Sequence, residues 1–185
     1  MKTLILNGSP RPAGDTAALL HRLEKELEGD VLRVDCYRAD ISPCVDCRSC
    51  MKTVGCAVED GMQEVYSYLR DCHNVVIASP LYFSELTGRL LDVCSRFQML
   101  YCAKAFVGAE LSLLPKKGGI IITGGGDGRP ERAVQTASAL LHTAGARDIF
   151  PPVMSLNTNT LPAGEDMTAL CGISRLADFL SAKLT

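Results

Sequence analysis

Three short, nearly continuous apolar runs limit the possible folds more than any other feature of the chain. They occupy residues 2–7, 74–79 and 118–123 and end in Asn-Gly, Ser-Pro and Thr-Gly. A strand that is covered on both faces is apolar at consecutive positions, and such strands belong to parallel sheets. The three runs are therefore predicted to be the central strands of a parallel sheet.

Two further segments suit the edges of this sheet. Residues 31–36 alternate in polarity, and residues 147–154 contain Pro151 and Pro152, which cannot donate hydrogen bonds within a central ladder. Helical stripes separate or follow the strands: Leu19, Leu20, Leu23 and Leu27; Met62, Val65, Tyr66 and Leu69; Leu86, Leu90 and Cys94; Val134, Ala137 and Leu141; Leu170, Ile173 and Leu176. No element is assigned to residues 101–117.

This alternation of strands and helices predicts an α/β fold, because right-handed crossovers place helices on both faces of the sheet. Five strands favour a flavodoxin-like doubly wound parallel sheet with strand order 2-1-3-4-5. The 185 residues are expected to form a single flavodoxin-like domain, 1–185.

Charge and hydropathy exclude several classes of partner. The net charge is -2, with no block of like charges, so no nucleic acid is expected. The apolar runs are far shorter than the roughly 20 residues that span a bilayer, so no membrane is expected either. Only three apolar residues precede Asn7, too few for a signal-peptide core, and the protein is expected to be cytoplasmic.

The loop after the first strand is a candidate anion site. Ligands of such sheets bind at the carboxyl ends of the strands, where the strand order reverses. Residues 8–16 read Gly-Ser-Pro-Arg-Pro-Ala-Gly-Asp-Thr and lead into a helix, so they offer hydroxyls, a guanidinium and a helix N-terminus to a phosphate. The glycine spacing of this loop matches neither the Walker loop nor the Gly-x-Gly-x-x-Gly loop of nucleotide-binding proteins. An ordinary turn capped by Asp15 or Thr16 is the alternative.

Two more loops at the same edge favour a ligand that carries a flat ring. Residues 79–88 expose the aromatic pair Tyr82 and Phe83, and residues 124–126 are three consecutive glycines that let a ligand lie against the backbone. Asp35 ends the second strand, where a dinucleotide fold has its ribose-binding acid, but the chain lacks the glycines of that fold. Asp35 is therefore predicted to be an ordinary polar strand end.

These loops resemble those of the NAD(P)H-dependent FMN reductases of the flavodoxin-like superfamily, which share the Gly-Ser-Pro-Arg start and a Ser-Pro-x-Tyr loop. The likeness extends to about residue 145. It implies an FMN site in which the first loop holds the phosphate, the second borders the isoalloxazine and the glycines close over it. These residues are Ser9, Arg11, Asp15 and Thr16; Pro80, Leu81, Tyr82, Phe83 and Ser84; and Gly124, Gly125 and Gly126.

The resemblance implies an FMN-dependent oxidoreductase that takes hydride from NAD(P)H and passes electrons to a flavin, a quinone or a redox partner. It also implies a homo-oligomer, a dimer or a tetramer. Asp15 replaces the family asparagine, and its carboxylate would repel the phosphate unless it turns away to cap the helix. A non-enzymatic electron carrier, of the flavodoxin type or of the iron-sulfur flavoprotein type, is the alternative function.

A cysteine cluster follows the second strand and is expected at the same sheet edge. Cys44, Cys47, Cys50 and Cys56 have x2, x2, x5 spacing, which suits a 4Fe-4S cluster better than a zinc ribbon. The iron-sulfur flavoproteins share this spacing, and the chain is similar to them through Gly128. FMN reductases without a cluster also keep cysteines here, and a zinc site used for dimerisation is a further alternative. The other five cysteines are interpreted as small buried residues.

Overall fold

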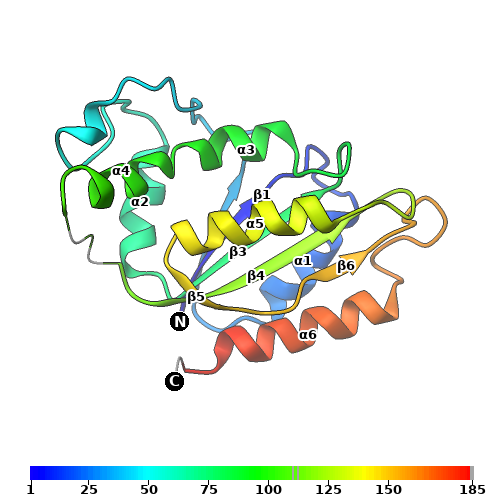
Figure 1. Cartoon of the computed structure of the whole chain (residues 1–185). Helices are drawn as coiled ribbons and strands as arrows, with labels where there is room; N and C mark the ends of the chain where they lie inside the picture. The colour runs from blue at the N-terminus through cyan, green and yellow to red at the C-terminus, as the bar shows by residue number, and fades with distance from the viewer. Residues whose placement is uncertain (110, 112, 184–185) are drawn as a thin grey trace.

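A parallel sheet of six strands forms the centre of the computed structural model, which describes residues 1–109, 111 and 113–183 (Figure 1). The strand order β2-β1-β3-β4-β5 confirms the predicted flavodoxin-like topology. The strands are β1 (Lys2–Asn7), β2 (Asp30–Asp35), β3 (Asn74–Pro80), β4 (Lys116–Thr123), β5 (Ala146–Ile149) and β6 (Val153–Ser155).

The fifth predicted strand is divided in two, and in this respect the prediction was wrong. β5 pairs with Lys116–Gly118 at the start of β4, whereas β6 pairs with Ile121–Thr123 at its end. Pro151 and Pro152 lie between the two strands and have no N–H group to continue the ladder. The outer edge of β4 is therefore covered by two short strands in succession.

Helices cover both faces of the sheet, as Figure 1 shows: α1 and α6 lie together on one face and α3, α4 and α5 on the other. Within the described residues, none of them is long and apolar enough to cross a membrane. They are α1 (Asp15–Glu26), the 3-10 helix η1 (Ser49–Met51), α2 (Met62–Asp71), α3 (Gly88–Ser95), α4 (Gln98–Ala105), α5 (Glu131–Thr143) and α6 (Met167–Ser181).

Alternate side chains of each central strand enter different cores, which explains the continuous apolar runs. In β1, Leu4 and Leu6 pack beneath α2 and α3, whereas Ile5 packs beneath α1 and α6. All three side chains are fully buried. The helix α4 occupies the start of the stretch 101–117, to which no element was assigned from the sequence; residues 110 and 112 of that stretch lie outside the described residues.

Candidate functional site

Three loops meet at the carboxyl edge of the sheet, where the strand order reverses between β1 and β3. The Thr87 hydroxyl donates to the Gly8 carbonyl at 2.8 Å and joins the loop after β3 to the loop after β1. The hydroxyls of Thr16, at the start of α1, and Thr123, at the end of β4, are hydrogen-bonded at 2.8 Å. The Leu81 N–H donates to the Thr123 carbonyl at 2.8 Å. The structure therefore brings the three predicted loops together.

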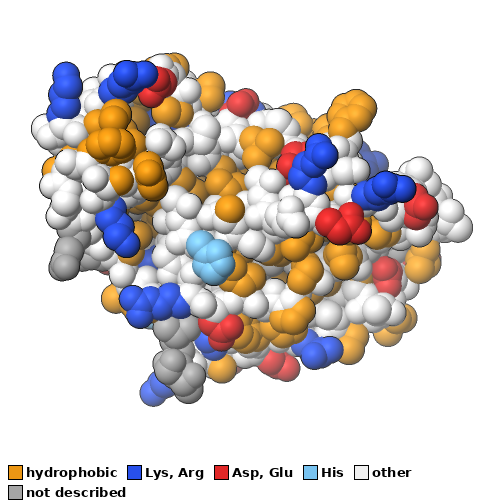
Figure 2. Space-filling model, in the orientation of Figure 1, with side chains coloured by type: hydrophobic (Ala, Val, Ile, Leu, Met, Phe, Trp, Pro, Cys, Tyr) orange, Lys and Arg blue, Asp and Glu red, His pale blue; other side chains and the backbone are white. Residues whose placement is uncertain are grey.

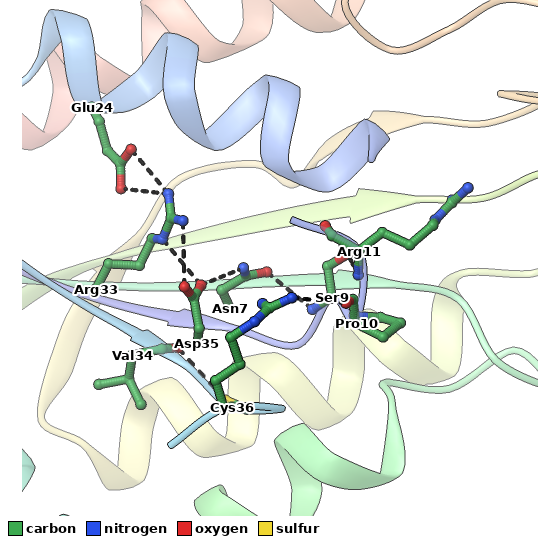
Figure 3. Close-up of polar contacts among 10 residues, drawn as sticks. Asn7, Ser9, Pro10, Arg11, Glu24, Arg33, Val34, Asp35 and Cys36 are labelled. Carbon is green, nitrogen blue, oxygen red and sulfur yellow. Dashed lines mark hydrogen bonds and ion pairs between the residues drawn. The ribbon is translucent and has the colours of Figure 1, made fainter. Parts of the chain in front are cut away.

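The first of these loops uses part of its hydrogen-bonding capacity internally. The Ser9 N–H donates to Asn7 Oδ1 at 3.0 Å, and the Arg11 N–H donates to Ser9 Oγ at 3.3 Å. Pro10 and Pro12 have no N–H to offer. The donors left for an anion are the N-terminus of α1, with Thr16, and the Arg11 side chain, which is 69% exposed (Figure 3).

The carboxylate of Asp15 does not cap the helix but divides its two oxygens between this loop and the loop after β6. Asp15 Oδ1 accepts a hydrogen bond from the Ala163 N–H at 3.1 Å, and Oδ2 pairs with Arg11 Nη2 at 3.4 Å. Gly14, which has no side chain, occupies the N-cap position. Asp15 thus ties the start of α1 to the loop after β6, and part of its charge is compensated by Arg11.

A charged network beneath the first loop holds it in position (Figure 3). Asp35 Oδ1 accepts hydrogen bonds from Asn7 Nδ2 at 2.7 Å and from Arg33 Nε at 3.0 Å, and Arg33 also pairs with Glu24 at 3.2 Å. Burial alone would raise the pKa of Asp35, but the hydrogen bonds from Asn7 and Arg33 outweigh it, and the pKa is lowered. Because Asn7 in turn accepts from the Ser9 N–H, the ionised Asp35 positions this loop. The sequence had predicted only a polar strand end.

The aromatic loop forms a tight two-residue turn. Tyr82 and Glu85 exchange both backbone hydrogen bonds, at 2.9 and 3.0 Å. The two residues between them have left-handed conformations, with φ of 55° at Phe83 and 63° at Ser84, which are costly for residues other than glycine. The turn leaves the Phe83 side chain 98% exposed. Glu85 Oε2 accepts from the Thr136 hydroxyl at 2.9 Å and fixes the turn to α5.

The glycine loop is held by a segment that the sequence did not suggest. The N–H groups of Asn157 and Thr158 donate to the carbonyls of Gly126 and Gly124, at 2.8 and 2.9 Å. A Cβ at Gly125 would lie 2.8 Å from the Asn159 side chain, so only glycine fits there without movement. The residues after β6 therefore complete this edge, and the Asn-Thr-Asn-Thr run at 157–160 was the available signal.

The cysteine segment, residues 36–60, does not remain at the carboxyl edge of the sheet, where the sequence analysis expected it. It follows α3 from its start, where Arg89 Nε donates to the Cys36 carbonyl at 2.9 Å, to its end, where the Cys44 N–H donates to Ser95 Oγ at 2.9 Å. The eight residues of α3 rise about 12 Å along the helix axis. Figure 1 shows the segment, in cyan, beside α4.

The four predicted thiols line one cavity of about 250 Å³ between this segment and α4. Cys102 of α4 adds a fifth thiol to its wall, which the sequence missed because no helix was assigned there. Burial, together with the neighbouring thiols of Cys102 and Cys56, raises the pKa of Cys50 to about 11. As they stand, no three Cys, His, Asp or Glu side chains of the described residues are close enough together to hold a metal ion.

A buried ion pair fixes the cysteine segment to the end of α3. The Arg96 side chain is 1% exposed, and its Nη1 lies 2.7 Å from Asp60 Oδ2. Arg96 also donates to the carbonyls of Ser42 at 2.9 Å and Val58 at 3.0 Å, on both sides of the cysteines. Burial alone would raise the pKa of Asp60, but the hydrogen bonds from Arg96 and from two backbone N–H groups outweigh it, and the pKa is lowered.

The chain is similar in sequence to known flavoproteins. A family model described as NADPH-dependent FMN reductase matches residues 1–160. An iron-sulfur flavoprotein of Methanosarcina thermophila is 26% identical over 186 residues, which cover 96% of this chain and 92% of that protein. One of Methanocaldococcus jannaschii is 32% identical over 141 residues, covering 74% and 68%. One of Archaeoglobus fulgidus is 28% identical, and the match spans only 64% of its length.

Solved structures agree with the fold. An NAD(P)H:quinone oxidoreductase from Methanothermobacter marburgensis superimposes with a TM-score of 0.71 at 15% identity, covering 100% of this chain and 98% of that one. An FMN-dependent NADH-azoreductase from Bacillus anthracis, solved in complex with FMN, gives a TM-score of 0.64 at 18% identity, covering 98% and 99%. At these identities the comparison supports the architecture alone.

Proposed function

Because the chain belongs to the NADPH-dependent FMN reductase family, we propose that it is an oxidoreductase that binds FMN at the carboxyl edge of its sheet. In this proposal it takes hydride from NADH or NADPH and passes the electrons to a flavin, a quinone or a redox partner. The observation that carries the proposal is the meeting of the loops after β1, β3 and β4, joined by Thr87–Gly8 and Thr16–Thr123 hydrogen bonds. It is the edge at which sheets of this topology bind ligands.

The chain's own residues would bind and orient the cofactor. The N-terminus of α1, the Thr16 hydroxyl and the Arg11 guanidinium offer donors to its phosphate, while Ser9 holds the loop in shape. This loop packs directly against the start of α3, because a Cβ at Gly8 would lie 2.8 Å from Thr87 Oγ1 and 2.9 Å from Leu90 Cβ. Residues 80–84 and 124–126 would border the ring. Bound FMN supplies the hydride-accepting chemistry.

We expect Arg11→Ala to weaken FMN binding by about tenfold. The guanidinium would make a charge-assisted hydrogen bond to the phosphate, but it is largely exposed and already pairs with Asp15, so the lower end of the usual range of about 1.5–3 kcal/mol applies. Calorimetric titration of the apoprotein measures the effect. Riboflavin, which has no phosphate, is the control: its affinity should not change. Equal affinities of the unmodified protein for riboflavin and FMN would contradict a phosphate site.

The reductase and electron-carrier functions are distinguished by the reaction with nicotinamides. We expect NADH or NADPH, mixed anaerobically with the FMN-loaded protein, to bleach the flavin absorbance in a saturable manner. Hydride transfer needs the nicotinamide within about 3–3.5 Å of the flavin, and so requires one open face of the ring. An added quinone should restore the absorbance. If dithionite reduces the bound flavin but neither nicotinamide acts faster than it does on free FMN, the carrier function replaces the reductase.

We further propose that Cys44, Cys47, Cys50 and Cys56 hold a 4Fe-4S cluster, which would divide two-electron hydride chemistry into single-electron steps. All four thiols line one cavity, and the relatives described above are named iron-sulfur flavoproteins. The thiols are not preassembled, and cluster binding would draw the segment together, as metal binding commonly does.

We also propose that the protein acts in the cytoplasm as a homo-oligomer. Large hydrophobic side chains are exposed beside the cysteine cavity: Val45 is 66% exposed, Tyr101 57% and Phe106 55%. Figure 2 shows hydrophobic side chains gathered over this part of the surface. Exposed apolar patches of this kind are typical of protein interfaces.

A further inference from the structure

The buried guanidinium of Arg96 has one nitrogen atom, Nε, without any hydrogen-bond partner among the described residues. Its Nη1 and Nη2 are bound by Asp60, Ser42 and Val58. Only one other buried side-chain nitrogen or oxygen of those residues lacks a partner, Asn74 Oδ1 in the core. Buried donors are nearly always satisfied, so an orphan donor indicates a missing acceptor.

The missing acceptor is expected on the side of the cysteine cavity. Arg96 and Cys56 both form part of the wall of this cavity. The Tyr66 hydroxyl also lies beside Cys56, but its proton is already donated to the Arg96 carbonyl at 2.7 Å. Of the side-chain donor atoms of Arg96 and Tyr66, Nε is therefore the one without any hydrogen-bond partner.

We propose that Arg96 donates its Nε hydrogen to the sulfur of Cys56 when that sulfur is a thiolate ligand, and so raises the reduction potential of the cluster. The inference rests on the cluster proposed above. Reduction adds one electron and therefore one negative charge, and no covalent bond of the protein forms or breaks. A buried cation with a hydrogen bond to a ligand sulfur stabilises the more negative state.

The remaining contacts of Arg96 make it a fixed donor. The ion pair with Asp60 and the two carbonyl contacts hold the guanidinium plane on both sides, so Nε cannot turn away to solvent. A purely structural role, in which Arg96 only anchors the cysteine segment, accounts for these contacts but leaves the orphan Nε unexplained. Arg96 is therefore inferred to be a positioning and potential-setting residue, whereas the thiols are the ligands.

The direct test uses protein labelled with 15N-arginine and loaded anaerobically with iron and sulfide. Pulsed electron paramagnetic resonance of the dithionite-reduced cluster should detect coupling to an arginine nitrogen. The coupling should persist in Arg48→Lys, the control for the other arginine that lines the cavity, and disappear in Arg96→Lys. Potentiometric titration should give a lower midpoint potential for Arg96→Lys, which keeps the positive charge but has no Nε–H donor.

A second control separates the donor from the anchor. Gln63 Nε2 donates at 2.9 Å to the Val58 carbonyl, which Arg96 Nη2 also binds, so Gln63→Leu loosens the same segment without approaching the sulfur. We expect Gln63→Leu to leave the midpoint potential unchanged. Equal shifts in Gln63→Leu and Arg96→Lys would show that anchoring alone sets the potential, and would overturn the proposal.

The possible failures are distinguishable. A wild-type cluster without arginine coupling, or with coupling that vanishes in Arg48→Lys, overturns the role of Arg96 and leaves the proposed cluster intact. Wild-type protein that holds FMN but no iron after reconstitution overturns both, while the flavin site stands. If Arg96→Lys does not fold or loads no iron, the comparison between wild type and Arg48→Lys still decides, because it needs no Arg96 variant.

Discussion

Replacing Cys50 by serine should remove almost all iron from anaerobically prepared protein, from about four irons per chain to nearly none. A serine hydroxyl is not ionised at neutral pH and is a poor ligand for an iron-sulfur cluster, which prefers soft thiolates. Cys50 lies beside both Cys56 and Cys102 in the cavity, so its loss leaves a gap at the centre of the thiol set. Iron and sulfide analysis, with the visible absorbance spectrum, measures the effect.

Two other serine variants make this experiment specific. Cys171 is exposed on α6, where the sequence interpretation as a buried residue was wrong. Because α6 packs on the opposite face of the sheet, Cys171→Ser should keep its full iron content. Cys102→Ser should also keep it, because the proposed ligands are the four loop thiols. Full iron in Cys50→Ser would contradict the ligand set. Loss of iron in Cys102→Ser but not in Cys44→Ser would assign α4 a ligand in place of the loop.

Replacing Asp60 by alanine should lower the free energy of unfolding by about 3–5 kcal/mol, because the Arg96 charge would remain buried without its counter-ion. The variant also loses the acceptors for the N–H groups of Ser42 and Met62. Urea unfolding at pH 7 measures the change. Asp92→Ala is the control: its carboxylate is half exposed and 3.8 Å from Arg89, so its loss should cost no more than about 0.5 kcal/mol. Similar losses in both variants would contradict the importance of the buried pair.

The difference in unfolding free energy between wild type and Asp60→Ala should also change with pH, in a direction that follows from the lowered pKa of Asp60. Because folding lowers the pKa of Asp60, its carboxylate contributes stability at pH values above its ordinary pKa of about 3.9. That contribution is lost as the pH falls through the lower, folded value. The difference in unfolding free energy between wild type and Asp60→Ala should therefore be constant from pH 7 to about pH 5 and shrink below about pH 4. A difference that grows on acidification would refute this linkage.

The core and strand order were predictable because they depend on short-range patterns. Apolar runs such as residues 118–123 show which strands are buried on both faces, and the crossover rule then leaves few topologies. The division of the last strand was less visible. Pro151 and Pro152 indicate that a ladder ends, but the sequence does not tell that the chain pairs again with β4 three residues further along that strand.

The site was predictable only where topology alone determines position. The loops after β1, β3 and β4 must share an edge in any sheet of this order, and they do. The position of the cysteine segment depends instead on single contacts between distant residues, such as Arg89 with Cys36 and Arg96 with Ser42. A side chain that binds backbone carbonyls more than fifty residues away leaves no local pattern, which is why Arg96 was missed.

The division of the outer strand has a consequence for how copies of this chain meet one another. A long exposed strand edge is a template on which a second molecule can add its own strand, and such additions lead to aggregates. Here the outer edge offers only the four residues of β5 and the three of β6, with two prolines between them. Neither piece reaches the usual strand length of about five to six residues. The break between β5 and β6 leads the chain to the residues that hold the glycine loop. The same break therefore protects this side of the sheet against uncontrolled strand addition.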